Sequence, residues 1–372
     1  MQSQVTIVLP VYNVEPYLRE CLDSVINQTL REIQIICVND GSTDGSPAIL
    51  EEYATRDSRI EIIHQENRGG GSARNAAYPF IRGNYTYFVD PDDWIDLKLC
   101  EKAWNEAETS QAEIVFLNFI NTKTWKSSKF NPSLPKIRQT PESKHELLRL
   151  TSTARKFWRT DFLLSHQVVF SEGKRPYNDN LPSWKGIVLA DKIALLNEPL
   201  YFRRIRPGSY QQSLGKSHFI FIDTMQEVAE MLKETGFYQV YRDLFEECKL
   251  NNHQRLYSQL PWSIRSSFFQ LVRESLTEDD RTFYRDETGK MKRRVLSFYR
   301  GLIDGQRLET MKYYFLESVK WAERCFRHWV VQPLQALIDN QSNETSSSDN
   351  IIPLPSQGIK DTHEEGQNRH VA

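Results

Sequence analysis

The chain has 372 residues, of which 39% are hydrophobic and 12% aromatic, enough for one large domain with an appendage or for two domains. Its formal net charge of −2 argues against a general nucleic-acid-binding protein, which would carry a basic surplus. No stretch approaches the ~18 apolar residues of a membrane-spanning helix, and the N-terminus lacks signal-peptide features. We therefore expect a cytoplasmic protein, soluble or peripheral at the inner face of the cell membrane.

The first part of the chain alternates strand and helix patterns, which is typical of an α/β domain with a mostly parallel sheet. The expected strands are Val5–Val11, Ile33–Asn39, Ile60–His64, Tyr85–Asp90 and Glu113–Ile120. Helices are expected after Pro16, after an N-cap at Ser46, and after Asp96, where Cys100, Ala103, Trp104 and Ala107 share one face. The pattern thus predicts a sheet built from β-α repeats.

Beyond residue 121 the pattern loosens. Residues 122–145 indicate a loop or irregular insertion, and residues 187–203 indicate a helix, a turn and a strand. Helical periodicity runs from 218 to about 338, with Gly236 ending the first of these helices. We expect an α/β domain at 1–215, a helical C-terminal region at 216–338 and a disordered tail at 339–372.

Five cysteines are widely spaced and include no CxxC pair. This spacing favours reduced thiols in the core over a disulfide framework or a zinc site. They are Cys21, Cys37, Cys100, Cys248 and Cys325.

Polar residues gather where the expected strands end, which is where open α/β sheets bind ligands. They follow the first strand at Pro10–Asn13, the second at Asn39–Gly45 and the fourth at Asp90–Asp93, with a glycine run at Asn67–Asn75 between. Taken singly, the second cluster could be a turn, and the glycine run a loop before a capped helix. Three carboxylates within Asp90–Asp93 favour a cation, because like charges repel.

Together these segments resemble family 2 nucleotide-sugar glycosyltransferases of the GT-A fold. The matching pieces are PVYNVEPYLRECLDSVINQT, VNDGSTDGS, N-x-G-x-x-x-A-R-N at Asn67–Asn75, and FVDPDDW, all within residues 5–95. A looser match covers Tyr177–Asp179 and Leu200–Ser209. The resemblance implies a Rossmann-like, mostly parallel sheet and an inverting hexosyltransferase. It would use a UDP-sugar donor and a glycan or lipid-linked glycan acceptor in bacterial surface polysaccharide synthesis.

The resemblance also implies roles for single residues. Tyr12 would pack on the uracil, Asp40 and Asp90 would bind the base and the ribose, and Asp92 would hold Mn²⁺ or Mg²⁺ against the diphosphate. Arg74 and Arg206 would neutralise phosphate charge. The implied donor and cofactor site is Pro10, Tyr12, Asn13, Asp40, Asn67, Arg74, Asp90, Asp92 and Arg206.

For direct displacement the resemblance implies a carboxylate general base downstream, and Asp179 matches it. Asn178 departs from the acid usual at its position, which leaves the assignment open to an inactive sugar-nucleotide-binding or scaffold protein. The resemblance also implies a flexible loop that closes on the diphosphate and carries a basic residue. Arg203 and Arg206 both match such a position, and Arg206 is favoured. A dinucleotide-binding oxidoreductase is disfavoured, because the glycine run fails the GxGxxG spacing and follows the third strand.

The remaining features are open to simpler readings. His64 is expected to be structural, Asp44 and Asp93 to cap helices or orient neighbours, and Cys37 to lie in the core. The basic and aromatic stretch Lys320–Trp329 could lie on an anionic membrane. It could equally pack on the α/β domain or form the contact of a homo-oligomer.

Overall fold

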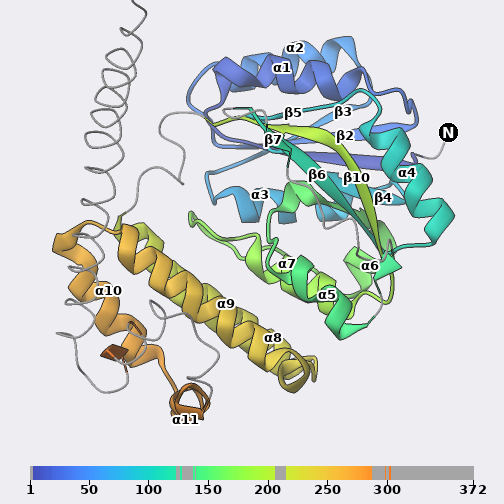
Figure 1. Cartoon of the computed structure of the whole chain (residues 1–372). Coiled ribbons are helices and arrows are strands. Elements are labelled where there is room, and N and C mark those ends of the chain that lie inside the picture. Colours follow the sequence, from blue (N-terminus) through green and yellow to red (C-terminus); the bar gives the residue numbers. More distant parts are fainter. Residues whose placement is uncertain are drawn as a thin grey trace, which may run out of the picture. The chain divides into compact units, whose positions relative to one another are not determined.

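The fold was described from a computed structural model, which defines residues 3–122, 126–127, 137–138, 140–205, 215–286, 298 and 301–302. The chain forms two compact units, Met1–Thr310 and Met311–Ala372, and all described residues belong to the first. One mixed sheet organises this unit (Figure 1). Its strand order is β3-β2-β1-β4-β9-β6-β10-β5, with β7 paired to β6 and β8 to β10.

The strands are β1 (Val5–Val11), β2 (Ile33–Asp40), β3 (Ile60–Gln65), β4 (Tyr85–Phe88), β5 (Trp94–Ile95), β6 (Ile114–Asn121), β7 (Lys126–Ser127), β8 (Ile137–Arg138), β9 (Lys156–Arg159) and β10 (Ile193–Arg203). The helices are α1 (Glu15–Ile26), α2 (Ser46–Arg56), α3 (Gly70–Ala76), α4 (Leu99–Ser110), α5 (Pro141–Leu148), α6 (Thr160–Ser165), α7 (Asn180–Leu189), α8 (Phe221–Glu234), α9 (Tyr238–Gln259), α10 (Trp262–Ser275) and α11 (Glu278–Asp286).

The expected mostly parallel sheet is confirmed. Strands β1, β2, β3 and β4 pair in parallel, as do β6 and β10, whereas β9 lies antiparallel between β4 and β6. All six of these parallel strands therefore point the same way, and their carboxyl ends form one edge. That edge carries the polar segments singled out in the sequence.

The core explains why β1 and β2 are continuous apolar runs. Every residue of both strands is buried, because helices cover both faces of this part of the sheet. On one face Ile7, Leu9 and Ile35 join a cluster with Leu22 of α1 and Leu50 of α2. Figure 1 shows α1 and α2 on this face, and α3 and α7 on the other. Cys325 lies outside the described residues. The other four cysteines are buried and form no disulfide, as expected.

Some expected elements need correction. The fourth strand ends at Phe88, two residues early. Ser46 is not the N-cap of α2: it is buried, and its hydroxyl accepts from the Val14 N–H, while Asp44 accepts from the Ser46 N–H. The helix of Asp96 begins only at Leu99, and Asp96 accepts from the Lys98 N–H.

The segment expected to be a loop, 122–145, contains the start of α5. Thr140 caps this helix by accepting from the Ser143 N–H at 3.3 Å, and Pro141 is its first residue. The short strands β7 and β8 also fall in this segment. The strand β9 was not anticipated, because four residues that include Lys156 and Arg159 carry no clear period.

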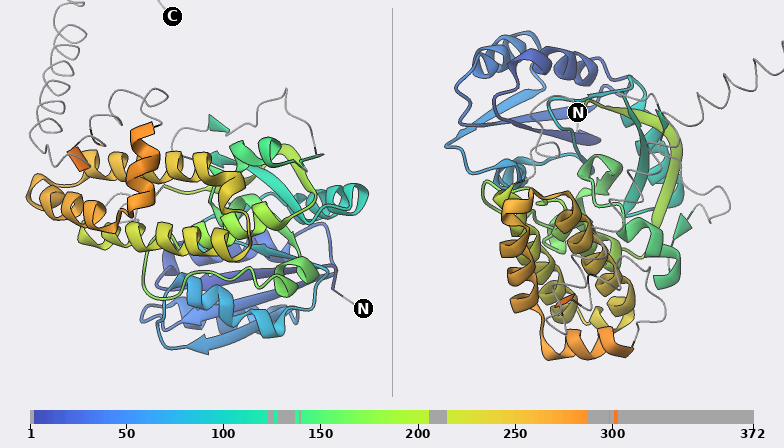
Figure 2. Two further views of the ribbon diagram at one scale, coloured as in Figure 1. Left: turned by 90° about the horizontal axis from the view of Figure 1, so that it is seen from below. Right: turned by 60° about the vertical axis from the view of Figure 1, so that its left-hand side comes forward.

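Helices α8 to α11 follow the sheet within the same compact unit (Figure 2). Helix α8 buries Ile222, Met225 and Leu232 of its expected face, whereas Ala229 is only half-buried, and Gly236 follows with φ +78°. Among the described residues, no helix is long and apolar enough to cross a membrane. The stretch Lys320–Trp329 and the expected tail lie outside the described residues.

Candidate functional site

Asp40, at the end of β2, holds the segment that leads into the glycine run. Its carboxylate is 2% exposed and accepts hydrogen bonds from the N–H groups of Arg68 and Gly69, each at 2.8 Å, and from Gln65 Nε2 at 2.7 Å. Asn67, in the same segment, is half-buried, and its backbone N would lie 2.7 Å from a Cβ placed on Gly41. Asp40 thus organises the loop in addition to any contact with a ligand.

The glycine run allows another chain segment to approach α3 closely. A Cβ on Gly69 would lie 2.2 Å from the carbonyl oxygen of Gly173, and one on Gly71 would lie 2.1 Å from that of Ser171. Gly69 also has φ +94°, in the region that favours glycine. These glycines therefore bring the 171–173 segment, and with it Asp179, against the carboxyl edge of the sheet.

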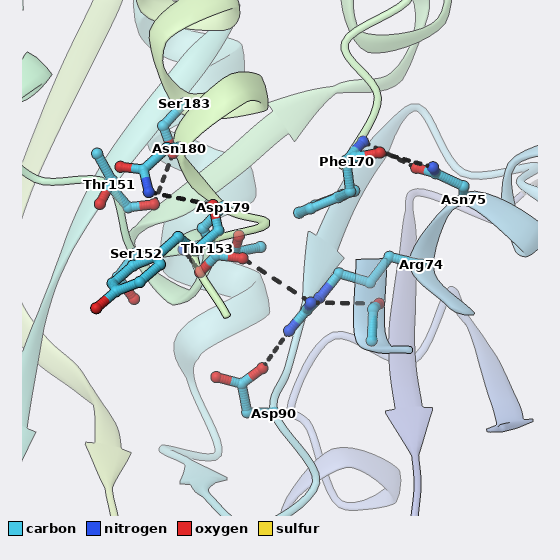
Figure 3. Close-up of polar contacts among 12 residues, drawn as sticks. Arg74, Asn75, Asp90, Thr151, Ser152, Thr153, Phe170, Asp179, Asn180 and Ser183 are labelled. Carbon is cyan, nitrogen blue, oxygen red and sulfur yellow. Dashed lines mark hydrogen bonds and ion pairs between the residues drawn. The ribbon is translucent and has the colours of Figure 1, made fainter. Parts of the chain in front are cut away.

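Arg74 lies between two carboxylates that are far apart in sequence (Figure 3). Its Nη2 is 2.6 Å from Oδ1 of Asp90, and its Nη1 is 3.8 Å from Oδ1 of Asp179. The guanidinium also packs over the ring of Phe170 at 5.2 Å. Burial acts to lower the pKa of Arg74, yet the two carboxylates outweigh it and raise that pKa. A permanent, buried cation therefore links the two acids.

Asp179, at the N-terminal end of α7, is held from two sides. Its Oδ2 accepts from the backbone N–H of Thr153 at 3.1 Å, and its Oδ1 faces Arg74. Oδ1 itself is buried and makes no hydrogen bond within the described part of the chain. About a quarter of the side chain, 27%, remains exposed. The carboxylate is fixed but still reachable, which suits a proton acceptor.

Asp92 and Asp93 follow β4 and have different surroundings. Asp93 is 4% exposed, and it accepts from the Tyr201 hydroxyl at 2.6 Å and from the Arg204 N–H at 2.7 Å. Burial, followed by the charges of Asp90 and Asp92, raises the pKa of Asp93 to about 8. Asp93 thus orients its neighbours, as expected, whereas Asp92 is half-buried.

Pro10, Tyr12 and Asn13 lie at or beyond the end of β1. Pro10 is buried and Tyr12 is 45% exposed, so its ring is available for stacking. Asn13 has φ +47°, and its Oδ1 accepts from the Thr43 N–H at 2.8 Å, which joins this loop to the one after β2. The two loops with ligand-type residues are therefore fixed to each other.

Three further residues, expected to be structural, have the following surroundings. Asp44 accepts from the N–H groups of Glu15 and Ser46 at the starts of α1 and α2, which confirms its capping role, and these bonds lower its pKa despite some burial. His64 makes contacts with Asn39 at 3.1 Å and Glu51 at 3.4 Å. Cys37 is fully buried.

Arg206 lies outside the described residues. Arg203 ends β10 and lies 5.8 Å from the ring centre of Phe119. The neighbouring Arg204 was not singled out from the sequence: its Nε donates to the Asp92 carbonyl at 2.9 Å, and its guanidinium packs on Trp94 at 4.6 Å. The feature of the sequence that could have identified Arg204 is its position directly after a strand, in an arginine-rich segment.

Comparison with known proteins identifies similar sequences. The family model for glycosyl transferase family 2 matches residues 6–168. EpsH of Bacillus subtilis is 32% identical over 250 residues, which cover 64% of this chain and 72% of EpsH. The uncharacterized glycosyltransferase EpsJ of the same species is 35% identical, over 55% of this chain and 62% of EpsJ. The glycosyltransferase GlyA of Streptococcus pneumoniae is 31% identical over 89% of this chain, which spans only 48% of GlyA.

A solved structure shares the fold. The crystal structure of S. aureus TarS 1-349 in complex with UDP-GlcNAc has a TM-score of 0.69 and 20% sequence identity. The superposition covers 83% of this chain and 91% of that one, so the similarity extends past the sheet into the helices that follow. The expected GT-A architecture with C-terminal helices is thereby confirmed.

Proposed function

Because the chain belongs to glycosyltransferase family 2, we propose that it transfers a sugar from a UDP-sugar to an acceptor hydroxyl with inversion, in bacterial surface polysaccharide synthesis. The observation that carries this proposal is the meeting of Asp90, Arg74 and Asp179 at the carboxyl edge of the sheet. These residues combine the chemistry of donor binding and of proton removal in one place. The reaction needs both.

On the donor side, Tyr12 is the exposed ring that would stack on the uracil, beside Pro10 and Asn13. The carboxylates of Asp40 and Asp90 would bind the base and the ribose. Asp40 is 2% exposed and already accepts three hydrogen bonds, so its main contribution would be to hold the loop that shapes the base pocket. Asn67 and Arg74 complete the donor site from the glycine run, and Arg206 would add a charge from the segment after β10.

The residues at the end of β4 fit Mn²⁺ or Mg²⁺ held jointly with the donor. Within the described residues no three His, Cys, Asp or Glu side chains form a cage. Magnesium-type ions commonly take one or two protein carboxylates and complete their shell with phosphate oxygens and water. Asp92 would supply that carboxylate, since Asp93 is engaged by Tyr201 and Arg204. The ion would stabilise the negative charge that develops on the leaving diphosphate.

On the acceptor side, Asp179 would take the proton of the attacking hydroxyl as the new glycosidic bond forms. Proton removal by a positioned base is typically worth on the order of 10²–10⁴ in rate. The Thr153 N–H fixes one carboxylate oxygen and Arg74 faces the other, which keeps the group oriented. Asn178 cannot replace it, because a neutral amide is not a useful base.

The acceptor would reach this base by way of a cavity of about 580 Å³ whose wall includes Lys174 and Pro176. Asp179 is not part of that wall, but it follows Pro176 by three residues, so their Cα atoms lie at most ~11 Å apart. Lys216 faces the cavity too, together with apolar Phe219 and Leu271 and one acid, Asp223. Two lysines beside apolar side chains suit the phosphate and lipid of a lipid-linked glycan.

The proposed function is tested by measuring UDP release from a panel of UDP-sugars, with Mn²⁺, with Mg²⁺ and after EDTA treatment. UDP-GlcNAc is the first donor to test, because TarS, which has the same fold, was solved in complex with it. Metal-dependent release that increases with a lipid-linked glycan acceptor is expected. Binding without turnover of any donor would instead favour the inactive sugar-nucleotide-binding protein.

A further inference from the structure

Lys156 is a lysine without solvent contact at the first position of β9. Its exposed fraction is 0%, and its Nζ donates to the carbonyl oxygens of Leu150 at 3.0 Å and Ser152 at 2.8 Å. The ammonium also lies 5.0 Å from the ring centre of Phe116, its neighbour on β6. Lysine is rarely buried completely, because removing its charge from water is costly. A specific interaction must compensate for this cost.

The bonds of Lys156 hold the segment from Leu150 to Thr153. The carbonyl between its two acceptors, that of Thr151, accepts from the hydroxyl of Ser183 on α7 at 2.6 Å. Side chains therefore bind three consecutive carbonyls of a segment that belongs to no regular strand or helix before residue 153. Such anchoring fixes the direction of the next backbone group, the N–H of Thr153.

That N–H is the donor that binds the candidate base. It reaches Oδ2 of Asp179 at 3.1 Å, and both residues are labelled in Figure 3. Lys156 also acts on Asp179 through its charge. Burial lowers the pKa of Lys156 to about 7, and the Asp179 carboxylate acts in the opposite direction.

We propose that Lys156 is a positioning residue for Asp179. It anchors the 150–153 segment so that the Thr153 N–H meets the carboxylate. This inference rests on the proposed function, in which Asp179 takes the proton of the acceptor hydroxyl.

A second buried lysine provides a matched control. Lys144 on α5 is 5% exposed, and its Nζ also donates to two carbonyls, those of Val188 at 3.3 Å and Ala190 at 2.6 Å. These acceptors lie at the C-terminal end of α7, about 15 Å along the helix from Asp179. Lys144→Met thus removes a comparable buried lysine without touching the 150–153 segment.

The test compares Lys156→Met, Lys156→Gln and Lys144→Met in the full chain. We expect Lys156→Met to lower kcat roughly tenfold or more with an unchanged donor KM. Lys156→Gln keeps a hydrogen-bond donor for the two carbonyls, so it should lose less kcat than Lys156→Met. Lys144→Met should keep the wild-type kcat.

Hydrogen exchange at the Thr153 amide separates this inference from the proposed function. Faster exchange in Lys156→Met, but not in Lys144→Met, supports the anchoring even if no donor is turned over, and in that case only the proposed function fails. A wild-type kcat in both Lys156 variants would overturn the positioning role. Unchanged Thr153 exchange in both would overturn the anchoring.

Discussion

Arg74 and Asp179 lie 105 positions apart in the chain, yet Nη1 of the arginine is 3.8 Å from Oδ1 of the aspartate. The same guanidinium pairs with Asp90 at 2.6 Å. A single buried cation therefore connects an acid at the donor end of β4 with the candidate base at the start of α7. This arrangement favours a mechanism in which donor and base are aligned by one rigid group.

The first prediction concerns Asp179→Asn. The variant should keep its fold and its affinity for UDP, because the amide retains an oxygen for the Thr153 N–H. Its kcat should fall by roughly 10²-fold or more, since an amide cannot take the proton. Steady-state kinetics and calorimetry with UDP check both points.

Glu172→Gln is the control for this variant, because Glu172 is exposed and seven residues away. It should keep full activity. An unchanged kcat in Asp179→Asn would move the base role to Glu172 or Asp191. Loss of UDP binding would show that Asp179 is structural.

The second prediction concerns the metal. Calorimetry should show that EDTA lowers the affinity for UDP by at least about tenfold, or 1.4 kcal/mol, and that Asp92→Ala abolishes most of the effect of added Mn²⁺. Asp243→Ala, at an exposed site on α9, should bind UDP like the wild type. Equal UDP affinity with and without metal would exclude an ion bridging protein and diphosphate.

The third prediction concerns the close approach at the glycine run. Gly71→Ala should destabilise the fold by about 1–3 kcal/mol in urea unfolding, because its Cβ would meet the Ser171 carbonyl. Gly70→Ala is the neighbouring control: its Cβ would be 3.5 Å from Arg74 Nη1, an ordinary contact, so its stability should change by less than about 1 kcal/mol. Similar stabilities for the two variants would contradict the close approach.

The fourth prediction concerns stability against pH. His253 on α9 is 1% exposed, and neither ring nitrogen has a hydrogen-bond partner within the described residues. Burial, and then the charge of Lys249, lower its pKa to about 3, while Asp280 acts in the opposite direction. Below the ordinary histidine pKa of 6.5 the unfolded chain therefore takes up a proton that the folded protein does not.

The free energy of unfolding should consequently fall by about 1 kcal/mol from this group between pH 7 and 5.5. His253→Leu should make the pH dependence shallower by that amount, as measured by urea unfolding at both values. A His253→Leu protein with the wild-type pH dependence would show that His253 is protonated in the fold.

The sequence by itself determined the architecture of the first half and the segments that carry the site. Strands β1 and β2 could be predicted because a fully buried strand must be apolar at every position, and both runs are local. The carboxyl ends of parallel strands meet at one edge, so Tyr12, Asp40 and Asp90 could be grouped without coordinates. The bond of Asp44 to the start of α2 could also be predicted, since Ser46 is only two residues away, whereas its bond to Glu15 joins positions 29 apart.

Only the tertiary structure decided which groups act on one another. Strand β9 is too short to show a period, and its Lys156 contradicts the apolar pattern of a buried strand. That position becomes acceptable only because the carbonyls of Leu150 and Ser152 bind its ammonium. The links from Arg74 to Asp179 and from Asp93 to Arg204 likewise join segments more than 100 residues apart. The periodicity of apolar residues shows which face of a helix or strand is buried. The partner of a polar side chain depends on how segments distant in the sequence meet in space, and a local sequence pattern does not contain that information.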